Sequence, residues 1–198
     1  MQEPRNPSEK AVSHVEKAAE LFQEAYRAQV QGDLSNAMRL YQESIQTHAT
    51  AEAYTFLGWT YSSLDRYDDA IAECKHAIAV DPDFGNPYND IGSYLIKLGK
   101  LDEAIPWLEK AMTAERYEPR HFPHLNLGRL YLAKGDQLKA VREFRQALRE
   151  DPYDRQALQS LYDAQHQQAG AGAPAIPMGG GIPAPNSTKT EVDQMRLR

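Results

Sequence analysis

The sequence has a single cysteine and no long apolar run, and each scarcity excludes a class of protein. Cys74 alone cannot form an intramolecular disulfide or a multi-cysteine zinc site. No stretch approaches the roughly 18 uninterrupted apolar residues of a transmembrane helix. Residues 1–10 contain no apolar segment of the kind found in secretory signals. We therefore expect a cytoplasmic protein with no membrane partner.

Positive charge is also scarce. The 198 residues include 22 Lys and Arg against 28 Asp and Glu, which gives a formal net charge of −6. Nucleic-acid-binding proteins usually present a basic face, so we expect no nucleic-acid partner. The apolar fraction of 41% is sufficient for one folded core.

One pattern recurs along the chain at intervals of 34 and 36 residues. Each copy has a glycine, an alanine twelve residues later, a core-type residue four further on, and a second alanine after three more. The copies are Gly58, Ala70, Cys74 and Ala77; Gly92, Ala104, Leu108 and Ala111; and Gly128, Ala140, Phe144 and Ala147. Apolar residues at helical spacing surround these positions. Each copy is therefore expected to be two antiparallel helices that approach closely at the glycine.

These columns resemble the tetratricopeptide repeat. The resemblance covers three units, at 51–84, 85–120 and 121–154, and a weaker unit at 18–50 that has Ala25 in place of the glycine. It implies an all-α fold, a right-handed α-solenoid of antiparallel helix pairs.

The solenoid is expected to span residues 11–168, with 155–168 as a capping helix. Residues 1–10 are expected to be a mobile lead-in, and the Gly- and Pro-rich residues 169–198 a disordered tail. The 85–120 unit is two residues longer than its predecessor, and we expect its second helix to be extended, ending near Tyr117.

Catalytic patterns are scarce. His121 and His124 are three residues apart, a spacing that permits metal binding. However, Pro123 lies between them, and no third ligand is near in sequence. Cys74 lies in the core column, which favours a buried residue over a nucleophile. We expect no enzyme activity, no catalytic residue, no cofactor and no metal.

The resemblance also implies a binding surface, because the first helix of each repeat lines a concave groove in this family. Carried over position by position, the expected partner-binding residues are Thr55, Phe56, Trp59, Asn86, Asn89, Asp90, Ser93, Lys97, Phe122, Asn126 and Arg129. Aromatic rings would supply contact area, and amides would bind an extended backbone. For Phe56 and Trp59 an equally good interpretation is packing beneath the N-terminal helices.

One subfamily is excluded on its residues. Tetratricopeptide co-chaperones that hold the C-terminal carboxylate of heat-shock proteins use a clamp of Lys, Asn and Arg. The corresponding positions here are Thr55, Trp59, Asp90, Phe122 and Asn126. Because Asp90 would repel a carboxylate, we do not expect this function.

The sequence therefore favours a non-catalytic adaptor that binds a peptide or helix of another protein in the groove. One alternative is a structural protein whose repeats self-associate into oligomers. Another is a chaperone-like protein for a secreted or assembled substrate.

Overall fold

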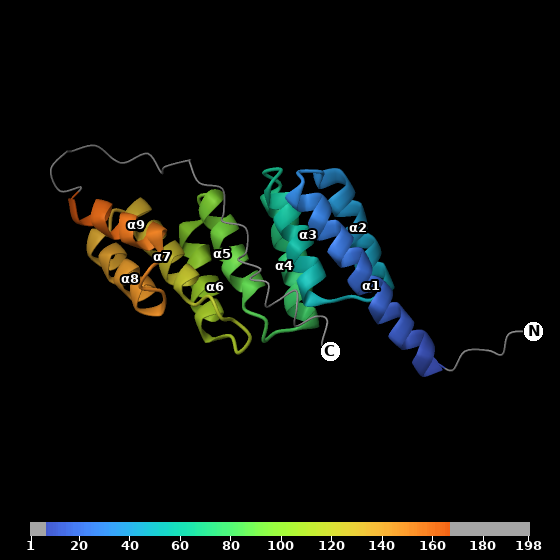
Figure 1. Cartoon of the computed structure of the whole chain (residues 1–198). Coiled ribbons are helices and arrows are strands. Elements are labelled where there is room, and N and C mark those ends of the chain that lie inside the picture. Colours follow the sequence, from blue (N-terminus) through green and yellow to red (C-terminus); the bar gives the residue numbers. More distant parts are fainter. Residues whose placement is uncertain (1–6, 167–198) are drawn as a thin grey trace, which may run out of the picture. The chain divides into compact units, whose positions relative to one another are not determined.

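The computed structural model describes residues 7–166, and this part of the chain folds into nine α-helices (Figure 1). In chain order they are α1 (Pro7–Val30), α2 (Leu34–Thr47), α3 (Ala51–Ser62), α4 (Tyr67–Val80), α5 (Asn86–Lys97), α6 (Leu101–Thr113), α7 (His121–Ala133), α8 (Gln137–Glu150) and α9 (Arg155–His166). Helices α4 and α8 end immediately before the Asp-Pro pairs at 81–82 and 151–152, since proline cannot continue a helix.

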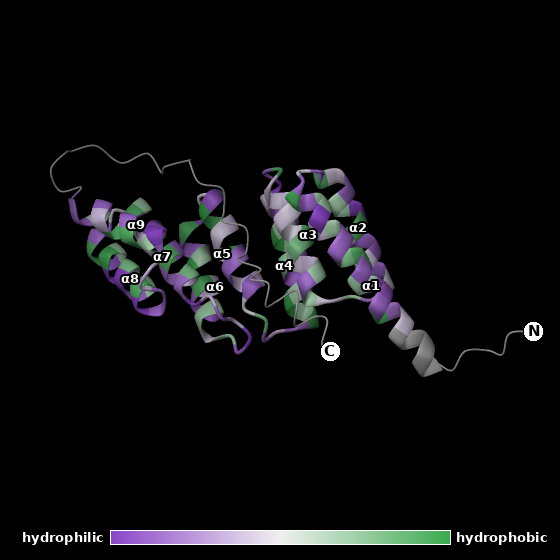
Figure 2. Cartoon of the chain, in the orientation of Figure 1, coloured by the Kyte–Doolittle hydropathy of each residue, from purple (hydrophilic) through white to green (hydrophobic). Residues whose placement is uncertain are grey.

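The helices pack as four successive pairs, α1 with α2, α3 with α4, α5 with α6 and α7 with α8, and each pair packs on the next. Helix α9 packs against α8 and α7. Each helix carries both hydrophilic and hydrophobic residues (Figure 2), so that each can bury one side against its neighbours. The predicted all-α repeat fold is confirmed.

The glycine column marks the closest approach within a pair. A Cβ atom on Gly92 would lie 2.5 Å from the Leu108 side chain, and one on Gly128 would lie 2.3 Å from the ring of Phe144. At Gly58 the facing residue is smaller, and the distance to the Cys74 sulfur is 3.3 Å. The recurring glycine and the recurring core-type residue of each repeat therefore lie against each other across the helix pair.

A left-handed residue separates the two helices of each pair. Gly32, Gly99 and Gly135 have φ angles of 82°, 74° and 76°, and Asp65 has a φ of 56° at the corresponding turn. Glycine adopts this conformation without steric cost.

The N-terminal pair packs through aromatic rings. Ala25 is fully buried at the glycine position, and the Phe22 and Tyr41 rings meet at 5.5 Å beside it. Helix α1 begins at Pro7, earlier than the boundary at residue 11 that the sequence suggested. The tail expected at 169–198 lies outside the described residues.

The extra residues of the 85–120 unit do not extend its second helix, so that prediction is wrong. Helix α6 ends at Thr113, and residues 114–120 form a loop that pairs with the turn after α4. The Arg116 amide donates to the Asp83 carbonyl at 3.0 Å, and the Gly85 amide donates to the Arg116 carbonyl at 3.1 Å. These two backbone bonds hold the loop against the turn after α4.

The Arg116 side chain strengthens this loop contact. Its guanidinium forms an ion pair with Glu52 at 2.7 Å and another with Asp81, and it lies 5.1 Å from the centre of the Phe84 ring. The loop of one repeat is thereby joined to α3 and to the turn after α4.

We expect Arg116→Ala to lower the free energy of unfolding by about 1 kcal/mol, because partly exposed ion pairs contribute modestly even when two share one guanidinium. Urea unfolding followed by circular dichroism measures this difference. Arg145→Ala is the control, since Arg145 is exposed on α8. Equal stability of the two variants would contradict a role for the Arg116 contacts.

Candidate protein-binding surface

The first helices of the repeats share one face of the stack. Helices α1, α3, α5 and α7 each contact the next odd-numbered helix, up to α9, whereas no two even-numbered helices of the described chain contact each other. The odd-numbered helices are therefore closer together and form the inner face. All the residues predicted to bind a partner belong to α3, α5 and α7.

The α3 part of this face is largely closed by α1. Phe56 is only 6% exposed, and its ring lies 5.2 Å from Phe22 and 5.8 Å from Tyr26. Thr55 is 2% exposed, and its hydroxyl donates to the Ala51 carbonyl at 2.7 Å. Thr55 and Phe56 are core residues, which corrects their assignment to the binding surface. For Phe56 this is the alternative that the sequence left open.

Trp59 is half-buried at the border of this core. Its ring meets Phe56 edge-on at 5.8 Å, which fixes one side of the indole. Trp59 is therefore packed on the α1 side while it keeps part of its surface in contact with solvent.

Polar side chains form a connected row where α5 and α7 meet. The Asn126 amide donates to the Asn89 side-chain oxygen at 3.0 Å, and Asn89 in turn is hydrogen-bonded to Asp90. All three residues are half-buried. The side-chain oxygen of Asn126 has no hydrogen-bond partner among residues 7–166. The row therefore has at least one polar group available to a ligand.

Asp90 carries an unusual charge state within this row. Burial raises its pKa to about 7, although the hydrogen bond from Asn89 acts in the opposite direction. The carboxylate lies close enough to Cys74 and Tyr94 to raise the pKa of both groups. Asp90 is thus partly protonated near neutral pH, which weakens the repulsion of an anion there and allows it to donate a hydrogen bond.

Arg129 lies one turn after Asn126 and faces α9. Its guanidinium donates to the Gln156 side-chain oxygen at 2.8 Å. Surrounding protein atoms lower its pKa, while the nearby Asp154 carboxylate acts in the opposite direction. The guanidinium has further N–H donors, so it can bind a second acceptor.

The remaining predicted residues lie along the same helices with different exposure. Asn86 and Ser93 are half-buried on α5, and Lys97 is exposed in its last turn. Phe122 is half-buried, and its ring lies 4.1 Å from the His121 ring and packs on the α7–α9 core. Phe122 is therefore partly committed to the fold.

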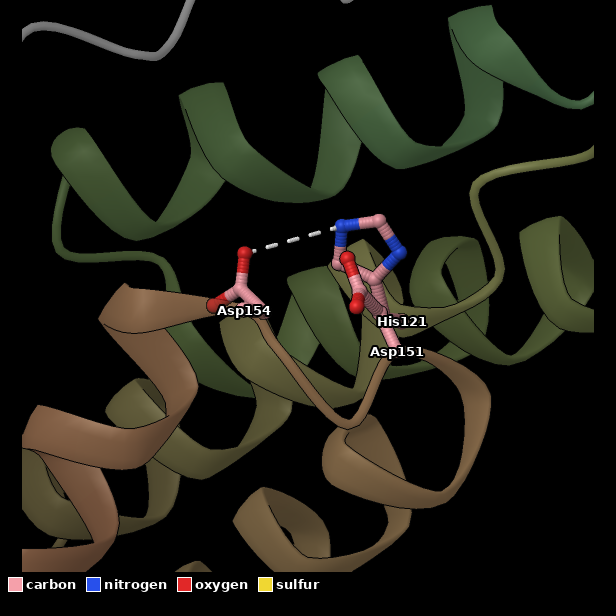
Figure 3. Close-up of side chains that lie close together, drawn as sticks. All are labelled: His121, Asp151 and Asp154. Atoms are coloured by element: carbon pink, nitrogen blue, oxygen red, sulfur yellow. Dashed lines mark ion pairs between the residues drawn. The ribbon is translucent and has the colours of Figure 1, made fainter.

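The two histidines at the start of α7 do not come together. His124 contacts Glu143 at 2.8 Å, whereas His121 turns toward Asp151 and Asp154 of the next turn (Figure 3). Asp151 and Asp154 follow His121 by 30 and 33 residues, so the residues near His121 in sequence do not reveal them. The repeat length could have indicated this proximity, since residues about one repeat apart become neighbours in a stack.

Two further observations concern other kinds of function. Cys74 is fully buried, and burial raises the pKa of its thiol, so the reactive thiolate is disfavoured. In the part of the chain that the structure describes, no helix is both long and apolar enough to span a bilayer.

The paired helices, the glycine contacts and the shared inner face define a helical-repeat protein. Tetratricopeptide repeat family models match residues 51–84 and residues 83–149. The chain belongs to the tetratricopeptide repeat family, whose members mediate protein–protein interactions.

Curated relatives share only part of this chain. Small glutamine-rich tetratricopeptide repeat-containing protein 2 of Saccharomyces cerevisiae is 30% identical over 100 residues, which is 50% of this chain and 29% of the relative. Heat shock protein STI1 of the same yeast is 28% identical over 97 residues, or 48% of this chain and 16% of the relative. The match thus spans less than a third of either relative.

Solved structures extend the likeness of the fold. Pseudomonas aeruginosa pilF has a TM-score of 0.73 at 19% identity, covering 78% of this chain and 70% of that chain. MamA has a TM-score of 0.61 at 23% identity, covering 72% and 83%. YrrB, described as a TPR protein with an unusual peptide-binding site, has a TM-score of 0.56 at 20% identity, covering 75% and 84%.

Proposed function

We propose that the chain is a non-catalytic adaptor that binds a segment of another protein along α5 and α7. The observation that carries this proposal is the polar row from Asn126 through Asn89 to Asp90, with Arg129 beside it. The Asn126 side-chain oxygen is not among the buried atoms that lack a partner, and Asn126 is half-buried, so this acceptor is open to solvent or to a ligand.

The chemistry of the row suits the backbone of an extended segment. A peptide amide supplies the N–H that the Asn126 oxygen lacks, and a peptide carbonyl accepts from the free donors of Arg129. Trp59 adds apolar area at the α3 end of the same face. The α1 rings close the region beyond Phe56, so the proposed surface is shorter than the repeat pattern suggested.

The proposed partner is not a heat-shock C-terminus, despite the similarity to STI1. Of the five clamp positions, Thr55 is buried, Trp59 and Phe122 are aromatic, and Asp90 bears a carboxyl group. Only Asn126 is an amide. A pair of terminal carboxylates would meet no lysine at these positions.

Replacement of Asn126 and Arg129 by alanine is expected to weaken partner binding at least tenfold while helical content stays unchanged. The matched control is Gln46→Ala with Arg145→Ala, which also removes one amide and one guanidinium, from exposed positions on α2 and α8. Partners captured from lysate by the unmodified chain are identified by mass spectrometry. The most abundant one is purified, and its affinity for each variant is then measured by calorimetry.

The proposal requires the Asn126/Arg129 variant to bind the partner more weakly than the control variant does. Equal loss in both would assign binding to general surface charge. Full binding by the Asn126/Arg129 variant would remove this face from the interaction.

Self-association is the second candidate function, and α9 offers the observation that favours it. Leu158 and Tyr162 are 48% and 58% exposed on this last helix, one turn apart. The apolar side chains available for end-to-end contact thus include this pair at the C-terminal cap. Light scattering across a hundredfold range of concentration decides this point, because a constant monomer mass rules it out.

A further inference from the structure

The last complete repeat contains a cluster of metal-ligating side chains that the adaptor function does not use. His121 opens α7, Asp151 follows α8, and Asp154 directly precedes α9 (Figure 3). One potential ligand atom from each residue lies within 4.8 Å of the other two. The side chains of His121 and Asp154 are only 12% and 15% exposed. Three donors of the right kind therefore converge in a sheltered place.

The local backbone fixes both carboxylates and leaves one oxygen of each available. Oδ1 of Asp151 accepts from the Tyr153 amide at 3.0 Å, and Oδ1 of Asp154 accepts from the Ala157 amide at 2.6 Å. Oδ2 of Asp154 lies 3.8 Å from Nε2 of His121. This separation is too long for a hydrogen bond. It suits two ligands that share one ion, since each metal–ligand bond is about 2.0–2.2 Å.

Equivalent positions in the earlier repeats are filled differently. Ala51 packs against Phe84, and Gly85 lies against Tyr117, so small and aromatic residues meet where this repeat brings His121 to Asp154. An apolar contact has thus been replaced by a polar one, and polar groups at a sheltered site need partners.

The earlier turn after α4 shows what such an aspartate binds. Asp81 occupies the position of Asp151 and accepts from the Asp83 amide at 3.0 Å in the same way. The second carboxylate oxygen of Asp81 is paired with the Arg116 guanidinium. Asp151 has no ion pair with any described residue. Its turn has the same geometry without the cation.

We propose that His121, Asp151 and Asp154 bind a divalent transition-metal ion such as Zn²⁺. An imidazole nitrogen with two carboxylate oxygens favours this class over Mg²⁺ and Ca²⁺, which prefer oxygen ligands alone. The nearby Arg129 guanidinium offsets part of the charge of Asp154, and the two carboxylates together still leave a net negative charge for the ion. Water completes the coordination. The ion would join α7 to the turn between α8 and α9 and so hold the C-terminal cap, which revises our expectation of no metal.

Titration of the full chain with ZnCl₂ in a calorimeter tests the proposal, with MgCl₂ as the comparison ion. We expect one Zn²⁺ per chain, and at least a tenfold weaker affinity in His121→Gln and in Asp154→Asn. Asparagine retains the helix-capping acceptor at position 154, so this variant removes the charge and leaves the cap. His76→Gln is the matched control, because His76 is an exposed histidine beside Glu73 on α4.

Each outcome of these titrations either supports or overturns the proposed metal site. Loss of Zn²⁺ binding in both cluster variants but not in His76→Gln, together with a Zn²⁺-induced rise in melting temperature that only the unmodified chain and the control show, supports the site. No binding by the unmodified chain, retained binding in the cluster variants, or equal affinity for Mg²⁺ overturns it. Circular dichroism confirms that each variant is folded before titration.

Discussion

Gly92→Leu is expected to lower the free energy of unfolding by about 3 kcal/mol or more, in the range of severe overpacking. A single Cβ atom at this position would already lie 2.5 Å from Cγ and Cδ2 of Leu108. Leu108 is fully buried, and protein interiors are close-packed, so a buried side chain has little room to move aside. A leucine at position 92 therefore forces α5 and α6 apart. Urea unfolding monitored by circular dichroism measures the loss.

A double-mutant cycle separates the steric effect from helix propensity. Alanine is the better helix former, so Gly92→Ala destabilises only if its methyl group meets Leu108. In the background of Leu108→Ala, which itself costs about 2–5 kcal/mol, the same Gly92→Ala change is expected to be neutral or stabilising. Gly99→Ala is the control for conformational strain, since that glycine has a φ of 74° and no atom within 4 Å of the added Cβ.

The coupling between the two positions is the deciding quantity. A Gly92→Ala effect of the same size with and without Leu108 would show that the glycine serves the backbone and not the contact. The alignment of the glycine column with the core column would then have to be abandoned.

These contacts explain why the repeat fold was predictable from sequence. Gly92 and Gly128 recur at a fixed distance from Leu108 and Phe144, and the structure places each glycine against its partner. A contact that recurs in successive repeats requires similar residues at the same spacing, which produces a periodic pattern in the sequence. The loop at 114–120 has no such pattern, because Arg116 meets Glu52 and Asp81 only when two successive repeats, 51–84 and 85–120, have stacked.

For the candidate surface, the sequence predicted which helix positions belong to the inner face, but not which of those side chains are exposed. Family positions located Asn89, Asn126 and Arg129 on the inner face, where α5 and α7 bring the two amides to 3.0 Å. The same positions selected Phe56, because the pattern contains no information about which element covers a helix. Phe22 of α1 lies over that ring, and α1 belongs to the repeat with the weakest signal.

Asp90→Asn is expected to stabilise the protein at pH 8 by about 2 kcal/mol and to have little effect at pH 4. An unfolded aspartate has an ordinary pKa near 3.9, whereas burial raises the pKa of Asp90 to about 7. The folded state thus holds a proton that the unfolded state has released between these values, so stability falls as the pH rises from about 4 to above 7. The full difference corresponds to about 4 kcal/mol at 1.36 kcal/mol per pH unit. Because Asp90 is only half-buried, solvent screens its charge. We therefore expect the stabilisation to be about half of this full difference.

Unfolding curves at pH 4, 6 and 8 measure the gain. Asparagine keeps the acceptor for Asn89 and removes only the charge. Asp163→Asn is the control, because Asp163 is exposed on α9 and accepts from Gln159 at 2.8 Å. A gain for Asp90→Asn that is equal at all three pH values would attribute the effect to packing, and no gain at pH 8 would place the carboxylate in open solvent. A gain confined to high pH would show that the polar row holds a charge at the expense of stability, as a binding surface does and a packing surface has no reason to do.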